Sequence, residues 1–118
     1  MELNPNKMMI DFTEAKKGFS FGENAGFIKA IRRTTVLNQD VASINNAAVG
    51  GLDITVPGIA IGDVVLAIAP NVDPGDDYTC QGTVTAANTV RLTCRNNSGG
   101  AVDLAGTVDW EIIWADLT

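Results

Sequence analysis

Few side chains in this sequence could carry out acid–base, nucleophilic or redox chemistry, and they are concentrated between residues 73 and 94. The chain contains one tyrosine, two cysteines and no histidine. Without histidine it lacks the usual general base, the usual activator of a nucleophile and the commonest transition-metal ligand. The candidates that are left are Tyr78, the thiols of Cys80 and Cys94, and an acidic cluster at residues 73–77.

The clearest local pattern is a β-hairpin over residues 78–95. Antiparallel pairing of Cys80 with Cys94 makes one face apolar or glycine, and this face also sets Gly82 opposite Leu92 and Val84 opposite Val90. The other face is polar and carries Thr79, Gln81, Thr83, Thr89, Arg91, Thr93 and Arg95. A slip by one residue would exchange the two faces, so the pattern specifies the register. Residues 86–88 are predicted to form the loop, with Asn88 in the left-handed conformation that such loops need.

The hairpin predicts that both cysteines are core residues. No further ligands stand at the spacing of a zinc site, and a catalytic thiol would need a base and exposure to solvent. We favour buried free thiols over a disulfide, because a bridge between directly paired strand residues tends to be strained. The acidic cluster lacks the spacing of an EF-hand loop, so a turn at Pro74 and Gly75 is favoured over a calcium site. The sequence therefore predicts no metal, no cofactor and no enzymatic activity.

Composition favours an all-β domain with one core. Apolar residues make up 46% of the chain and charged residues 19%, which is typical of a folded globular protein. Val, Ile and Thr are plentiful and favour strands, while twelve glycines supply turns. Besides the hairpin, strands are predicted over residues 35–44 (interrupted at 38–40), 52–56, 63–69 and 107–114. Short strands at this spacing predict an antiparallel β-sandwich or a jelly-roll-like barrel.

Two of the predicted strands are unusually apolar. Residues 63–69 form a continuous apolar run, which we expect to be a central strand, buried on both faces or covered on one face by a partner. In residues 107–114 one face carries Val108, Trp110, Ile112 and Trp114. We expect both tryptophans to belong to the core.

Residues 1–33 differ from the rest of the chain. All four phenylalanines lie here, separated by Lys, Gly, Glu and Asn without a sustained period, although a short helix over residues 11–17 is one option. We therefore predict an N-terminal arm, extended or partly helical, over residues 1–33 and a β-sandwich body over residues 34–118. The arm residues predicted to contact a partner are Lys7, Phe12, Lys16, Lys17, Phe19, Phe21, Phe27, Lys29, Arg32 and Arg33.

Charge is divided unevenly along the chain. The net charge is −6, yet residues 1–40 hold six basic residues against five acidic ones, and residues 41–118 hold two against nine. An acidic body repels nucleic acid, whereas the basic start is either a solvated tail or an arm that lies on an acidic partner. No run is long enough to span a bilayer and the first residues do not read as a signal peptide, so we expect synthesis in the cytoplasm and no membrane partner.

Three pieces of sequence within residues 56–114 occur in an order that matches a known module. They are Gly62-Asp63 before an apolar strand, Ala87-Asn88-Thr89-Val90 at the hairpin turn, and residues 96–103 before the last strand. In their order and spacing they resemble a β-module of tailed-bacteriophage head decoration (cement) proteins and head fibres. The resemblance implies a structural virion protein on the outer capsid surface, a homotrimer, with the major capsid protein as its partner.

The hypothesis from the sequence is therefore a capsid decoration protein. The residues expected to take part in self-association are Val65, Ala67, Arg91, Arg95 and Ile113. One alternative is a head-fibre or adhesion module that recognises a cell-surface glycan through an exposed aromatic, with Tyr78 or Trp114 as candidates. Another is a small hydrolase or lyase that uses Asp76 or Asp77, which the absence of histidine disfavours.

Overall fold

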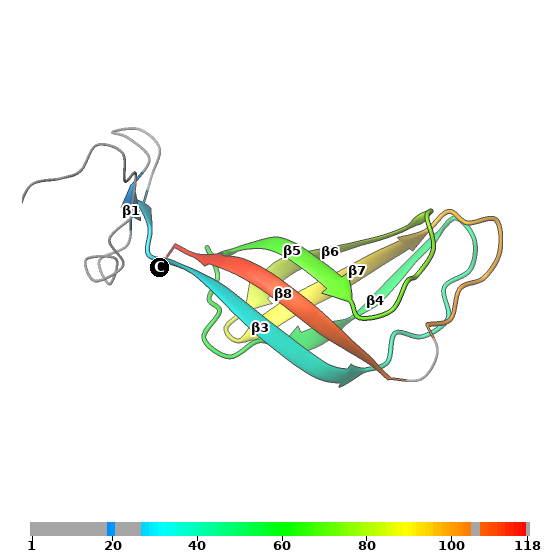
Figure 1. Ribbon diagram of the computed structural model, residues 1–118, viewed down its shortest axis with the longest axis horizontal. Coiled ribbons are helices and arrows are strands. Elements are labelled where there is room, and N and C mark those ends of the chain that lie inside the picture. The colour runs from blue at the N-terminus through cyan, green and yellow to red at the C-terminus, as the bar shows by residue number, and fades with distance from the viewer. Residues whose placement is uncertain (1–18, 21–26, 105–106, 118) are drawn as a thin grey trace, which may run out of the picture.

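The computed structural model describes residues 19–20, 27–104 and 107–117, and this part of the chain is all-β, as predicted (Figure 1). Its strands are β1 (Phe19–Ser20), β2 (Phe27–Ile28), β3 (Ala30–Gln39), β4 (Ala48–Thr55), β5 (Val64–Pro70), β6 (Tyr78–Ala86), β7 (Thr89–Asn96) and β8 (Val108–Asp116). Within these residues no helix has the length and apolar character needed to cross a membrane.

The body consists of two three-stranded antiparallel sheets in a sandwich-like arrangement. One sheet has the strand order β3-β8-β5 and the other β4-β7-β6. Figure 1 shows the two sheets as separate layers, with β8 central in one and β7 central in the other. The short strands β1 and β2 pair only with each other. The last strand, β8, pairs with β3 and β5, and β7 pairs with β4. Each sheet therefore joins segments that are far apart in the sequence.

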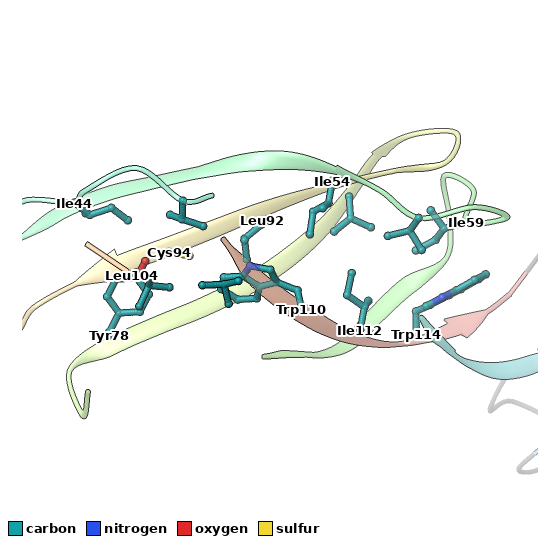
Figure 2. Close-up of a cluster of buried hydrophobic side chains, with 14 residues drawn as sticks. Ile44, Ile54, Ile59, Tyr78, Leu92, Cys94, Leu104, Trp110, Ile112 and Trp114 are labelled. Carbon is teal, nitrogen blue, oxygen red and sulfur yellow. The ribbon is translucent and has the colours of Figure 1, made fainter. Parts of the chain in front are cut away.

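The core lies between the sheets and is centred on β8. Trp110 and Ile112 are fully buried, and Trp114 is 2% exposed, which confirms that both tryptophans are core residues. Figure 2 shows Trp110 and Ile112 pointing from β8 toward Leu92 and Ile54 of the opposite sheet, and Trp114 farther along β8 on the side of Ile59. Burial of each large apolar side chain contributes about 1.5–3 kcal/mol, so this strand supplies much of the stabilisation.

The predicted hairpin is present in the predicted register. Cys80 pairs with Cys94, Gly82 with Leu92 and Val84 with Val90. Asn88 has a φ of 59°, the left-handed conformation expected of it. The strand β6 extends to Ala86 after a register shift that follows Val84, so the turn proper is narrower than the predicted loop. Local alternation and turn chemistry were sufficient to specify this element.

The predicted boundary between arm and body at residue 33 falls inside β3. This strand starts at Ala30, and its residues 31–36 pair with residues 110–115 of β8. The strand ends at Gln39, after Asn38 adopts a φ of 57° and the register shifts. The predicted continuation to Ile44 is wrong: Ile44 forms only an isolated bridge with Val102. The helix suggested for residues 11–17 lies outside the described residues.

The apolar run at residues 63–69 is not a central strand. It forms β5, which lies at the edge of its sheet beside β8. Val65 and Ile68 are half-buried, but Val64 and Leu66 are 46% and 53% exposed, so burial on both faces is wrong. A register shift between Val65 and Ala67 interrupts the inward-outward alternation.

Candidate interaction surfaces

The outward face of the β3-β8-β5 sheet carries large apolar side chains that remain exposed at the end of β8. Ile31 and Val64 flank Ala115 in one cross-strand row. In the next row on this face Ile113 pairs directly with Ala67. Ile31 is 50% exposed and Ile113 is 40% exposed, whereas Ala115 between its neighbours is buried. We call the surface made by Ile31, Val64, Ala67, Ile113 and Leu117 the apolar face.

A polar row borders the apolar face toward the middle of the sheet. The Arg33 Nε–H donates to Glu111 Oε2 over 2.8 Å, and the Thr35 hydroxyl donates to Glu111 Oε1 over 2.7 Å. The hydrogen bond from Arg33, followed by that from Thr35, lowers the pKa of Glu111 below its usual value. The same contact raises the pKa of Arg33. The apolar face therefore has an ordered, charged border, as many interaction surfaces do.

The outward face of the other sheet is mostly polar, although Val49 of β4 also lies on it and is 56% exposed. Along β6 and β7 it carries Thr79, Gln81, Thr83, Arg91, Thr93 and Arg95, and we call it the Thr/Arg face. Arg91 lies 3.6 Å from Asp53 of β4 in an exposed ion pair. A shallow hollow of about 210 Å³ on this face is lined in part by Gln81, Thr93 and Arg95. Threonines and arginines are well solvated, so this face, with Val49 as a single exposed valine among polar neighbours, has less apolar surface to cover than the apolar face.

The residues predicted for self-association do not form one surface. Ala67 and Ile113 pair directly on the apolar face. Val65 instead points inward, where one of its methyl carbons would lie 3.1 Å from a Cβ placed on Gly82. Arg91 and Arg95 belong to the Thr/Arg face on the opposite sheet. The sequence located part of the apolar face but could not show which sheet each residue would join.

Two of the predicted arm residues are engaged within the body. The Arg32 guanidinium contacts Asp116 at 3.1 Å and lies over the Trp114 ring at 5.8 Å from its centroid. Arg33 is paired with Glu111. Lys29 is exposed next to β3, and Phe19 and Phe27 belong to β1 and β2. The arm residues that lie outside the described part of the chain are Lys7, Phe12, Lys16, Lys17 and Phe21.

The aromatic residues proposed for glycan recognition are not exposed. Tyr78 is 6% exposed and Trp114 is 2% exposed, because both point into the core (Figure 2). Their prediction as surface aromatics is wrong. Asp76 and Asp77 are exposed beside the turn that precedes β6. Across the described ranges no three His, Cys, Asp or Glu side chains are grouped as metal ligands would be.

Two buried carboxylates were not anticipated. Asp63 and Asp116 are each 6% exposed. Asp63 accepts hydrogen bonds from the backbone N–H groups of Ala60 and Leu117, both at 2.9 Å. It thereby ties the loop before β5 to the end of β8. The turn at Gly62 was the only local signal, since the donor at Leu117 is distant in the sequence.

The sequence pieces that carry the resemblance hold loops in place. Asn88 Oδ1 accepts the Gly58 N–H over 2.8 Å, so the hairpin turn fixes the loop after β4. Asn96 is fully buried, and its side-chain N–H₂ group donates to the carbonyl oxygens of Ile44 and Gly100 at 2.8 and 2.7 Å. The hydrogen bonds of Asn88 and Asn96 give both residues a structural role in fixing loops.

The two cysteines are free thiols that face each other inside the hairpin. Their sulfur atoms lie 3.6 Å apart. Cys94 is fully buried, whereas Cys80 is half-buried and borders a cleft of about 320 Å³ between β5 and β6. The hydrogen bond between the thiols and burial both raise the pKa of Cys80 above its ordinary range. The Cys80 thiol and the Tyr78 hydroxyl lower the pKa of Cys94 to about 7, against the effect of burial.

Tyr78 completes this environment. Burial raises the pKa of its hydroxyl above the ordinary value, so the hydroxyl keeps its proton. In the described part of the chain the Tyr78 hydroxyl has no acceptor with good hydrogen-bond geometry, but it lies near enough to Cys94 to stabilise the thiolate of that residue.

Comparison of the whole chain with protein-family models, curated proteins and solved structures gave no match.

Proposed function

We propose that this protein is a structural virion protein that decorates and stabilises a bacteriophage capsid. In this proposal the body associates as a homotrimer, and the N-terminal arm contacts subunits of the major capsid protein on the outer surface. The observation that carries the proposal is the apolar face, where Ile31, Val64 and Ile113 remain exposed in adjacent rows of one sheet. Exposed apolar rows of this kind are typical of interaction sites.

A second copy of the chain is the simplest cover for this face. Its apolar rows stand beside the Arg33–Glu111 pair, so they offer both hydrophobic contact and a charged border for register. Two three-stranded sheets favour a compact sandwich over the larger jelly roll, and a compact body leaves little area for a tight single contact. Trimerisation would join three arms, so weak arm contacts would add up through avidity.

Solution mass and capsid binding test the proposal together. Sedimentation of the full chain should give a trimer, and the protein should bind capsids that lack their decoration protein. Replacing Lys7, Lys16 and Lys17 with glutamate in the full chain should leave the trimer intact and weaken capsid binding at least tenfold, because arm charges set attachment. A monomer at all concentrations would refute the trimer, and undiminished binding by the variant would refute the role of the arm.

The glycan-binding alternative now depends on the hollow of the Thr/Arg face. Gln81, Thr93 and Arg95 offer hydrogen-bond donors there, but the buried Tyr78 and Trp114 supply no stacking surface. Glycan binding by the isolated protein that disappears in Gln81→Ala, with unchanged stability, would favour this alternative over decoration.

A further inference from the structure

The paired thiols Cys80 and Cys94 have a geometry that the proposed function does not use. We propose that they are a redox modification site, at which a low-molecular-weight disulfide converts them into an intramolecular bridge between β6 and β7. The proposal is independent of the partner that the apolar face binds.

The backbone is already in place for the bridge. Cys80 and Cys94 are directly opposite in an antiparallel pair. Opposed residues of such pairs have Cα atoms about 4.5–5.5 Å apart, within the range of about 4.4–6.8 Å that disulfides span. Their sulfur atoms are 3.6 Å apart. Rotation of the two side chains would bring the sulfurs closer without a change of strand pairing, and the bridge would carry the strain expected between directly paired residues.

Access to the two sulfurs is unequal, which sets the order of events. Cys80 is half-buried on the edge strand β6 and borders both the cleft toward β5 and the hollow of the Thr/Arg face. Cys94 is fully buried on the central strand β7. A small oxidant therefore reaches Cys80 first, and Cys94 acts as the resolving thiol.

The reaction is a pair of thiol–disulfide exchanges. The Cys80 thiolate attacks one sulfur of the small disulfide, which forms a mixed disulfide and releases one small thiolate. The Cys94 thiolate then attacks the Cys80 sulfur, so that the protein disulfide forms and the second small thiolate leaves. Two protein thiols are oxidised, one small disulfide is reduced, and the two protons end on the small thiols.

The surrounding groups assist both steps. The lower pKa of the pair belongs to Cys94, so the first attack requires Cys80 to pass its proton to Cys94, whose sulfur lies 3.6 Å away. For the second attack the buried Tyr78 hydroxyl stabilises the thiolate of Cys94. The groups that act on the pair are thus all within the hairpin.

Closure of the bridge would secure an edge of the sandwich. The strand β6 pairs with β7 on one side only, and its other side faces the cleft toward β5. A covalent link to the central strand prevents β6 from separating and reduces the freedom of the unfolded chain. The thiol form suits a reducing cytoplasm, and the bridged form suits oxidising surroundings.

Oxidation of the full chain in buffers of reduced and oxidised glutathione tests the proposal. Under denaturing, non-reducing conditions we expect chains that are not linked to one another, that have each lost the mass of two hydrogen atoms and whose two thiols are blocked to alkylation. The unfolding midpoint should rise by roughly 5–10 °C and return after reduction. Thiols that stay free in the most oxidising buffer, bridges only between chains, or an unchanged midpoint would each overturn the proposal.

Single serine variants test the order of events. Cys94→Ser should accumulate a mixed disulfide with glutathione at Cys80, because the resolving thiol is gone. Cys80→Ser should stay unmodified while folded, because Cys94 is buried. Equal modification of both variants in the folded state would refute the assigned roles, and alkylation after denaturation provides the control that each remaining thiol is intact.

Discussion

The two sheets of the body have the same number of strands but differ in regularity and in what they present to solvent. The β4–β7 pairing is unbroken from Ala48 to Thr55, and the β6–β7 pairing shifts only beside the hairpin turn, after Val84. The outward side of this sheet is the Thr/Arg face. In the β3-β8-β5 sheet both pairings contain a register shift, and its outward side includes the apolar face. A polar face can stay in water as it is, whereas an exposed apolar face indicates a partner. Because the Thr/Arg face carries only Val49 among its polar side chains, we propose that the apolar face is the surface that binds.

The regular sheet depends on a glycine, and Gly51→Ala should have the largest effect of the changes considered. Gly51 has a φ of 150°, and a Cβ placed on it would lie 1.9 Å from the carbonyl oxygen of Leu92. We expect a loss of about 4 kcal/mol in the free energy of unfolding, since backbone atoms of β7 would have to move.

Gly100→Ala is the matched control, because no atom lies within 4 Å of a Cβ there. It should change the free energy of unfolding by less than about 0.5 kcal/mol. Denaturant unfolding of both variants measures the difference. A Gly51→Ala protein as stable as the parent would show that the regular register does not require close approach at this position.

The end of the same sheet is fixed by a buried amide, which Asn96→Asp should disrupt. The side chain of Asn96 donates to two backbone carbonyl oxygens. A carboxylate would lose both donations and would face the carbonyl oxygens directly, at a cost of about 3 kcal/mol. Asn97→Asp adds the same charge at an exposed position and should be nearly neutral. Similar thermal midpoints for the two variants would contradict the role of Asn96.

The regular sheet was also the part of the fold that the sequence predicted best. Strict alternation around Cys80 and Cys94 specified the register, and Asn88 specified the turn. The β3-β8-β5 sheet was predicted less well, because an apolar run such as Val64–Pro70 has the same pattern in a central strand and in an edge strand with an exposed apolar face. Local pattern does not show which element covers a face.

The candidate interaction surfaces, like the strands, could be predicted from the sequence only where a local pattern was sufficient. Ala67 and Ile113 were named from the sequence, but their direct pairing depends on β8 lying between β3 and β5. The burial of Tyr78 could have been predicted, because the hairpin alternation puts Tyr78 on the same face as Cys80. The burial of Asp63, in contrast, depends on a donor at Leu117. Such long-range contacts leave no periodic signal, so no reading of one segment could supply them.

Matched charges on the two outward faces test directly whether only one face binds. Ile113→Glu places a carboxylate opposite Arg33 on the apolar face, and Thr83→Glu places one opposite Arg91 on the Thr/Arg face. Both carboxylates meet an arginine across the sheet, so both monomers should fold. We expect Ile113→Glu to weaken self-association by about thirtyfold (about 2 kcal/mol), because the charge would lose water in the contact.

Thr83→Glu should leave self-association unchanged. Sedimentation over a range of concentrations measures both variants under the same conditions. Equal weakening by the two changes would place the Thr/Arg face in the contact as well and would remove the distinction between the sheets.

The smallest effect is expected at the border of the apolar face, where Glu111→Gln removes the charge that pairs with Arg33. Because hydrogen bonds from Arg33 and Thr35 lower the pKa of Glu111, its contribution to stability is present above the unfolded-state pKa. This contribution is lost as the pH falls through the folded-state pKa. The parent should therefore be slightly more stable than the variant at neutral pH, and the two should converge in acid.

The concentration dependence of that small difference sharpens the comparison further. In the monomer the pair is exposed and screened by salt, so its removal changes the unfolding midpoint little. If self-association covers this border, removing Glu111 leaves the Arg33 charge without its partner in a site with less water. The loss of stability caused by the substitution is then larger than in the monomer. Midpoints of the parent and Glu111→Gln should thus diverge as the protein is concentrated. A difference that stays constant with concentration, in a protein that does associate, would place the border outside the contact and confine binding to the apolar rows.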